Sequence, residues 1–73
     1  MRLEYDSRMD AAYIYLDLSK TAKATRTYAC DPEEAGGQFH LDFDDAGRLI
    51  GIEVLDASHK LPEALLQAEA ALD

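Results

Sequence analysis

The sequence has little of three things: cysteine, positive charge and long apolar runs. Its single cysteine, Cys30, excludes an internal disulfide and a four-thiolate zinc site, and it favours a reducing compartment, with the cytoplasm as the default. No stretch approaches the roughly 20 apolar residues that a membrane span requires, and the N-terminal segment has no apolar run of signal-peptide length. We therefore expect a cytoplasmic protein with no membrane partner.

Basic residues are too few to suggest a polyanionic partner. Seven lysines and arginines stand against fifteen acidic residues, which gives a formal net charge of −8. The closest basic grouping is Lys20, Lys23 and Arg26, and the other basic residues are scattered. Because such a surface repels phosphate backbones, we expect no nucleic-acid partner.

The overall composition and length of the chain fit a small folded domain. Apolar residues make up 48% of the 73 residues and charged residues 30%, a balance typical of globular chains. One domain over residues 1–73 is expected, and at this length a single core gives only marginal stability. A second copy or another protein is therefore expected to complete the fold.

Polar and apolar residues alternate through most of the first 55 residues, which is the pattern of half-buried strands. In the second such segment, Ile14 and Leu16 share one face while Tyr13 and Tyr15 share the other. In the last segment, Gly51 lies where a missing side chain permits the close approach of a neighbour. The alternation predicts strands at residues 2–5, 12–18, 38–44 and 48–55, and a further strand is predicted at residues 22–30, which contain Thr25, Thr27 and Tyr28 without helical periodicity.

Turn residues and a change of period complete the fold prediction. A loop is expected from Pro32 to Gly37, and a hairpin turn is expected at residues 45–47. After residue 58, apolar residues recur at helical spacing, and this predicts an amphipathic helix over residues 62–72. Its apolar stripe consists of Leu61, Leu65, Ala68 and Leu72. We predict an α+β fold: a small antiparallel β-meander of four to five strands packed with one C-terminal α-helix.

Three stretches resemble a known family. They are the run Asp45-Ala-Gly-Arg-Leu-Ile-Gly-Ile-Glu-Val-Leu-Asp-Ala-Ser58, the pair Tyr5-Asp6, and the run Asp10-Ala-Ala-Tyr-Ile-Tyr-Leu16. Together they resemble the bacterial domain of unknown function 2283 (DUF2283), and the likeness covers nearly the whole chain. The resemblance implies a compact meander with a terminal helix and no particular reaction. Some relatives look like partners of toxin-like proteins.

The hairpin also matches part of a calcium-binding pattern. Asp42, Asp44, Gly47 and Glu53 fall at the first, third, sixth and twelfth positions of an EF-hand loop. The fifth position is Ala46, so one ligand is missing, and both flanks alternate as strands where an EF-hand has helices. We therefore interpret the segment as a turn.

His40, Asp42 and Asp44 are the nearest candidates for metal ligands, because an extended strand places them on one face. Their spacing of ~7 Å along the strand is too wide for one ion unless the side chains converge, and a solvated sheet face is the simpler interpretation. We predict no metal site, no cofactor and no catalytic residue. The acidic neighbours of Cys30 disfavour a reactive thiolate, and no spacing identifies a triad.

Exposed tyrosines are the best functional signal. Tyr13, Tyr15 and Tyr28 are predicted to project from the sheet opposite its aliphatic side, as an interaction surface or as the surface covered by the helix. The first hypothesis is a non-catalytic protein-interaction module that self-associates or binds a protein partner. An antitoxin-like protein that neutralises a basic partner is an alternative, as is a small metal-binding or hydrolytic enzyme that uses the hairpin Asp and His residues.

Overall fold

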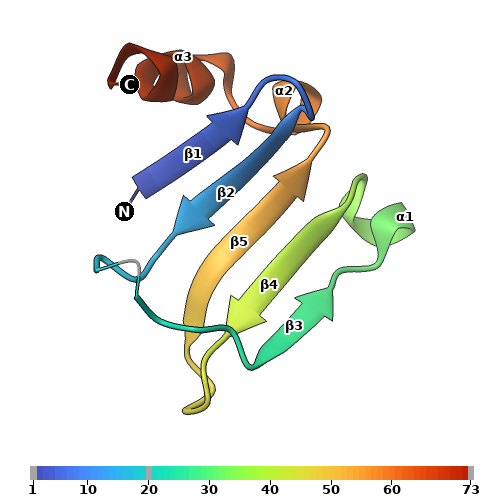
Figure 1. Ribbon diagram of the computed structural model, residues 1–73. Helices are drawn as coiled ribbons and strands as arrows, with labels where there is room; N and C mark the ends of the chain where they lie inside the picture. The colour runs from blue at the N-terminus through green and yellow to red at the C-terminus, as the bar shows by residue number, and fades with distance from the viewer. Residues whose placement is uncertain (1, 20, 73) are drawn as a thin grey trace.

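The computed structural model describes residues 2–19 and 21–72, and in residues 68–72 it describes the backbone alone. The described chain forms one antiparallel sheet with the spatial order β1-β2-β5-β4-β3 (Figure 1). The strands are β1 (Arg2–Asp6), β2 (Ala11–Tyr15), β3 (Arg26–Ala29), β4 (Phe39–Phe43) and β5 (Leu49–Leu55). The helices are α1 (Pro32–Ala35), α2 (Ala57–Lys60) and α3 (Glu63–Leu72). The prediction of an α+β fold with an antiparallel sheet is confirmed.

The sheet is not a simple meander, so that part of the prediction is wrong. β2 pairs with β5 and not with β3, with Ile14 opposite Ile52 and Ala12 opposite Val54. This pairing places the most apolar strand at the centre of the sheet, where both of its edges are hydrogen-bonded. The connection after β2 then runs along one end of the sheet to reach β3 at the far edge (Figure 1).

Asp17 explains why β2 is shorter than the predicted strand at residues 12–18. Its carboxylate accepts hydrogen bonds from the backbone N–H groups of Thr21 and Ala22, at 2.9 and 2.7 Å. These bonds curl the chain into a turn, and the bond from Ala22 is the main reason that the pKa of Asp17 is lowered. Alternation continued to Leu18 in the sequence, but a local side-chain bond ended the strand. Leu18 is consequently exposed.

The prediction of one helix is also wrong, because the described chain contains three. α1 lies inside the predicted loop at residues 32–37, where Asp31 caps the N–H of Glu33 at 2.9 Å and Pro32 occupies the first turn. Gly36 ends α1 with a φ of 74°, in the left-handed region. Turns and helix caps use the same residue types, which is why the sequence pattern predicts a loop at these four residues.

The two faces of the sheet differ in chemistry. Cross-strand register and alternation place Tyr13, Tyr15, His40, Asp42 and Glu53 on one face, here named the tyrosine face. The other face, named the helix-side face, carries Leu3, Tyr5, Ala12, Ile14, Tyr28, Phe39, Leu41, Phe43, Ile52 and Val54. All of the strand carboxylates, Glu4, Asp6, Asp42 and Glu53, occupy tyrosine-face positions.

The core occupies only part of the helix-side face. Its buried members are Leu3, Ala12 and Val54 from the sheet, Ala57 from α2 and Leu66 from α3. Leu66, which was not placed in the predicted stripe, is the buried residue of α3, while Leu65 is half-buried. The side chains of Ala68 and Leu72 lie outside the described residues.

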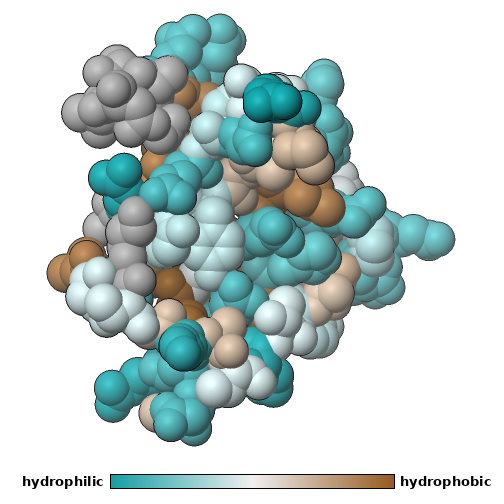
Figure 2. All heavy atoms as spheres, viewed as in Figure 1, coloured by the Kyte–Doolittle hydropathy of each residue, from teal (hydrophilic) through white to brown (hydrophobic). Residues whose placement is uncertain are grey.

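Two of the helices, α2 and α3, lie toward the β1 side of the sheet, and α1 lies at the other side, next to β3 and β4 (Figure 1). α3 packs against β1 and α2 packs against β5, and the molecule measures 33 × 32 × 18 Å along its principal axes. The side drawn in Figure 2 is mainly hydrophilic, with hydrophobic residues in separate patches. None of the helices in the described residues has the length and apolar content needed to cross a membrane.

Candidate functional site

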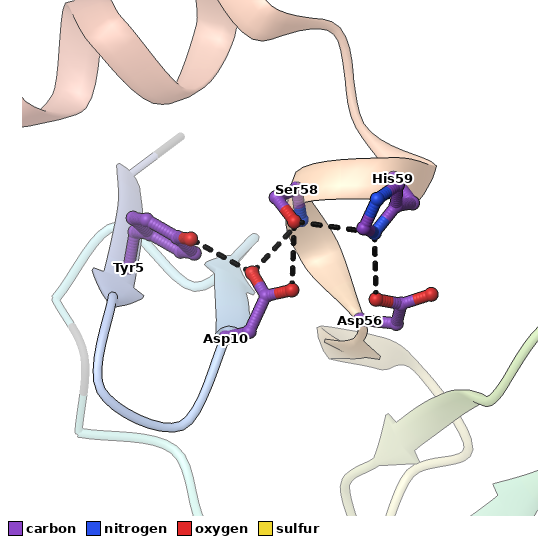
Figure 3. A network of polar contacts seen from close by, with 5 residues as sticks. All are labelled: Tyr5, Asp10, Asp56, Ser58 and His59. Atoms are coloured by element: carbon purple, nitrogen blue, oxygen red, sulfur yellow. Dashed lines mark hydrogen bonds and ion pairs between the residues drawn. The ribbon is translucent and has the colours of Figure 1, made fainter.

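A cluster of polar side chains joins the β1–β2 turn to α2, and Figure 3 shows it from close by. We name it the Asp10 cluster; it comprises Tyr5, Asp10, Asp56, Ser58 and His59. The phenol of Tyr5 donates to Asp10 Oδ1 at 2.7 Å, and Ser58 Oγ donates to Asp10 Oδ2 at 2.7 Å. The backbone N–H of Ser58 also donates to Asp10 Oδ1, at 2.9 Å. Asp10 is therefore hydrogen-bonded to a residue 48 positions further along the chain.

The position of Asp10 is that of a helix cap supplied by a distant segment. Asp56 precedes α2 but makes no side-chain capping bond, whereas Asp10 receives the N–H of Ser58 on its side chain and that of Ala57 on its carbonyl oxygen. Asp10 and Asp56 adopt φ values of 50° and 55°, a conformation that aspartate tolerates better than most residues. Hydrogen bonds from Tyr5 and Ser58 hold the pKa of Asp10 below its usual value.

Ser58, His59 and Asp56 have the residue types of a catalytic triad but not its geometry. His59 Nδ1 contacts both Ser58 Oγ, at 3.4 Å, and Asp56 Oδ1, at 2.9 Å. In a catalytic triad, one ring nitrogen of the histidine contacts the serine hydroxyl, and the other ring nitrogen contacts the carboxylate. The hydroxyl of Ser58 is instead directed at Asp10. The geometry is that of a cap and not of an activated nucleophile.

The same cluster supplies a set of metal-ligand types. Ligand atoms of Asp10, Asp56 and His59 lie within 4.8 Å of one another, and two carboxylates with an imidazole suit a divalent cation. Both oxygens of Asp10 already accept hydrogen bonds from the protein. The hydrogen-bonded cap accounts for the arrangement without an ion.

Sequence reasoning did not single out the Asp10 cluster as a site. Tyr5, Asp10, Asp56 and Ser58 do lie in the stretches that carry the family resemblance, which was the signal available. Their proximity depends on β2 pairing with β5, because that pairing brings Asp10 next to the residues that follow β5.

The tyrosine face carries a second hydrogen-bonded group. Tyr13 donates to Asp42 Oδ2 at 2.6 Å, and Thr27 donates to Asp42 Oδ1, also at 2.6 Å. The rings of Tyr13 and Tyr15 meet edge to face with their centroids 4.7 Å apart. Burial and the bond to Asp42 raise the pKa of Tyr13, so its phenol remains a donor at neutral pH.

Gly51 makes this arrangement possible. A Cβ atom at position 51 would collide with the phenol of Tyr13, whose ring lies over the glycine. The prediction that position 51 permits a close approach is confirmed, and the neighbour is Tyr13.

The predicted metal candidates do not converge, since each has a partner of its own. His40 Nδ1 lies 2.7 Å from Glu53 Oε1 on the neighbouring strand, and Asp42 receives Tyr13 and Thr27. Asp44 lies in the hairpin turn, where it accepts the N–H groups of Ala46 and Arg48. Strands flank this turn on both sides, which confirms the interpretation of the EF-hand match as a hairpin.

The three tyrosines of the predicted interaction surface lie on two faces. Tyr13 and Tyr15 share the tyrosine face, but Tyr28 pairs with Leu41 on the helix-side face and is 53% exposed. Cys30 is a free, half-buried thiol at the end of β3, beside an open depression of about 500 Å³ that Tyr28 and His40 also line. The imidazole of His40 is engaged by Glu53, so this depression does not pair the thiol with a free base.

Part of the helix-side face stays at least partly exposed in the described structure. We name it the open face; it comprises Ile14, Tyr28, Leu41, Phe43 and Ile52, of which Ile14 and Ile52 also pack against the core. Ile14, Ile52, Leu41 and Tyr28 form one cross-strand row, and none of the five side chains is fully buried in the described structure. At the margin, the guanidinium of Arg26 lies 4.2 Å from the centre of the Phe43 ring.

Comparison with known families identifies the chain. The family model described as "Protein of unknown function (DUF2283)" matches residues 2–58. The chain belongs to this family. The DUF2283 match spans the whole sheet together with Ser58 of the Asp10 cluster, and it ends before α3. No curated protein and no solved structure is similar enough to the chain to count as a match.

Proposed function

We propose that this DUF2283 chain is a non-catalytic protein-interaction module that binds another protein chain through its open face. The observation that carries the proposal is the apolar row from Ile14 to Tyr28, in which Ile14, Ile52 and Leu41 are half-buried and Tyr28 is exposed. A sheet face with this composition is stabilised by a second layer, and the core that α2 and α3 form with the sheet involves mainly β1, β2 and β5, with Phe39 of β4 at its margin. The proposal places the module in the cytoplasm, because a reducing compartment suits the free thiol of Cys30.

A role for the tyrosine face in binding is supported less well. Tyr13 is bonded to Asp42, and the rings of Tyr13 and Tyr15 pack on each other. These contacts give the two tyrosines a use within the chain itself. Of the three tyrosines predicted to interact, Tyr28 is the one that fits the proposed surface.

The net charge of −8 favours a second candidate function, an antitoxin-like protein that neutralises a basic partner. Such a partner would contact carboxylates, and the strand carboxylates lie on the face opposite the open face. A hydrolytic or metal-dependent role for the hairpin has less support, because His40, Asp42 and Asp44 are hydrogen-bonded to neighbours.

Site-specific photocrosslinking tests the proposed function. A photoreactive phenylalanine analogue is placed at Tyr28 on the open face or, as the matched control, at the adjacent Ala29, which pairs with His40 on the tyrosine face. Both positions are exposed on the same edge strand. In the native host we expect a covalent protein adduct from position 28 and little or none from position 29. Equal yields at the two positions, or no adduct at position 28, would contradict the proposal.

A further inference from the structure

We infer that the partner of the open face is a second copy of this chain, packed face to face in a symmetric dimer. This inference rests on the proposed function and names its partner. Two independent observations support it: the distribution of charge over the sheet, and the placement of the helices.

The charge distribution permits self-docking in spite of the acidic composition. A net charge of −8 opposes the approach of two copies, and carboxylates at the contact would make that repulsion severe. The open face has none, because all four strand carboxylates occupy the opposite face. The charged strand residue near its margin is Arg26, which is stacked on Phe43. Two copies can thus meet through neutral apolar strand positions, with their strand carboxylates outside the contact.

The placement of the helices leaves room for the second copy. α3 lies against β1 and α2 against β5, while α1 lies in the connection between β3 and β4 and has no buried residue (Figure 1). A two-fold axis through the open face would place α2 and α3 of the two copies at opposite ends of the contact. Each sheet would then supply the missing layer of the other, about 10 Å away, as in a β-sandwich.

Sedimentation equilibrium of the full chain, with protein concentration and salt as variables, tests this inference. The expected mass rises with concentration from 8.1 kDa towards twice that value. Because the contact is apolar and the two copies repel, raising NaCl from about 50 mM to about 500 mM should tighten the dimer about three- to tenfold. A dimer that high salt weakens would overturn the inference, since its contact would then depend on opposite charges.

Two neighbouring substitutions locate the contact. Tyr28→Glu adds a carboxylate to the open face and should raise the dissociation constant at least about tenfold, because the new charge must be buried in each copy. Ala29→Glu adds the same charge to the other face of the same exposed strand, and it should change the dissociation constant less than about threefold. Circular dichroism checks that both variants fold. A dimer that survives Tyr28→Glu unchanged would overturn the inference.

The outcomes also separate this inference from the proposed function. A chain that stays monomeric at all concentrations, yet gives adducts of another protein from position 28 and not from position 29, overturns the self-association while the interaction module stands. A chain that stays monomeric and gives no adduct from position 28 overturns both.

Discussion

At the residue scale, Gly51 and Tyr13 form a pair in which the missing side chain of one makes room for the ring of the other. The phenol can reach Asp42 across the sheet only because position 51 carries no Cβ atom. A glycine in a strand interior is ordinarily destabilising, and here the hydrogen bond and the ring packing offset that cost.

Gly51→Ala is expected to destabilise the protein by about 1–3 kcal/mol, because the new methyl group displaces the Tyr13 ring. The measurement is urea unfolding within a double-mutant cycle. In a Tyr13→Val background the same substitution should cost close to nothing, since the collision is gone. An equal cost in both backgrounds would show that Tyr13 is not the reason for the glycine.

Asp10 is the second residue whose role depends on a contact far away in sequence. Its folded pKa is lowered, chiefly by the bond from Tyr5 and then by those from Ser58. A lowered pKa means that the carboxylate contributes stability above the unfolded value near 3.8, and that this stability is lost as pH falls through the folded value.

Asp10→Asn is therefore expected to lower the free energy of unfolding at neutral pH. The difference in this free energy between the variant and the native protein should narrow below about pH 4. Asparagine has nearly the same shape and tolerates the positive φ at this position, so the substitution removes the charge and one hydrogen-bond acceptor and leaves the backbone conformation accessible. Urea midpoints measured from about pH 7 to about pH 2 give the test, with the exposed Asp45→Asn as control. Parallel curves for Asp10→Asn and the native protein would refute the role of the carboxylate.

At the scale of elements, Leu66 is the buried residue among the side chains of α3 that the structure describes. It is 9% exposed and lies in a cluster with Leu3 of β1. Leu65 packs against the same cluster and is half-buried, so Leu66 makes the largest buried contribution among the described side chains of α3.

Leu66→Ala is expected to cost about 2–4 kcal/mol, because it removes a buried side chain that the surroundings cannot replace. Gln67→Ala, at the exposed neighbouring position, should change stability by less than about 0.5 kcal/mol. Denaturant unfolding followed by circular dichroism compares the two. A loss for Leu66→Ala no larger than that for Gln67→Ala would mean that α3 is not packed on β1 as described.

At the scale of the whole molecule, the described chain buries few apolar residues completely. Leu3, Ala12, Val54, Ala57 and Leu66 form the buried core of a 73-residue chain. A core of this size gives little net stability after the conformational entropy of folding is subtracted. Association through the open face would add buried apolar area to this core.

Self-association should therefore make stability depend on protein concentration. A thirtyfold increase in concentration is expected to raise the thermal midpoint by about 2–8 °C, because mass action favours the folded dimer. The midpoint of Tyr28→Glu, measured by calorimetry over the same range, should stay constant. A native midpoint that is independent of concentration would contradict a dimer coupled to folding.

Local sequence features determined much of the fold. Alternation, together with the residue types of the segment at 22–30, predicted segments that overlap all five strands, and the change of period after residue 58 predicted the position of α3 to within one residue. Both signals are local, because a strand or helix with one buried face repeats its apolar residues at its own period. The strand ends were predicted less well where a side chain bonded to nearby backbone, as Asp17 does after β2.

The tertiary structure decided which strands are neighbours and which side chains meet. Alternation could not show that β2 pairs with β5, because apolar residues on either neighbour satisfy the same pattern. That one pairing assembles the Asp10 cluster and places Tyr13 over Gly51. The order of the strands likewise puts Tyr28 on the face opposite Tyr13. The sequence by itself determined which residues prefer burial, while long-range hydrogen bonding determined which of them share a surface, since strand pairing is not encoded within any one strand.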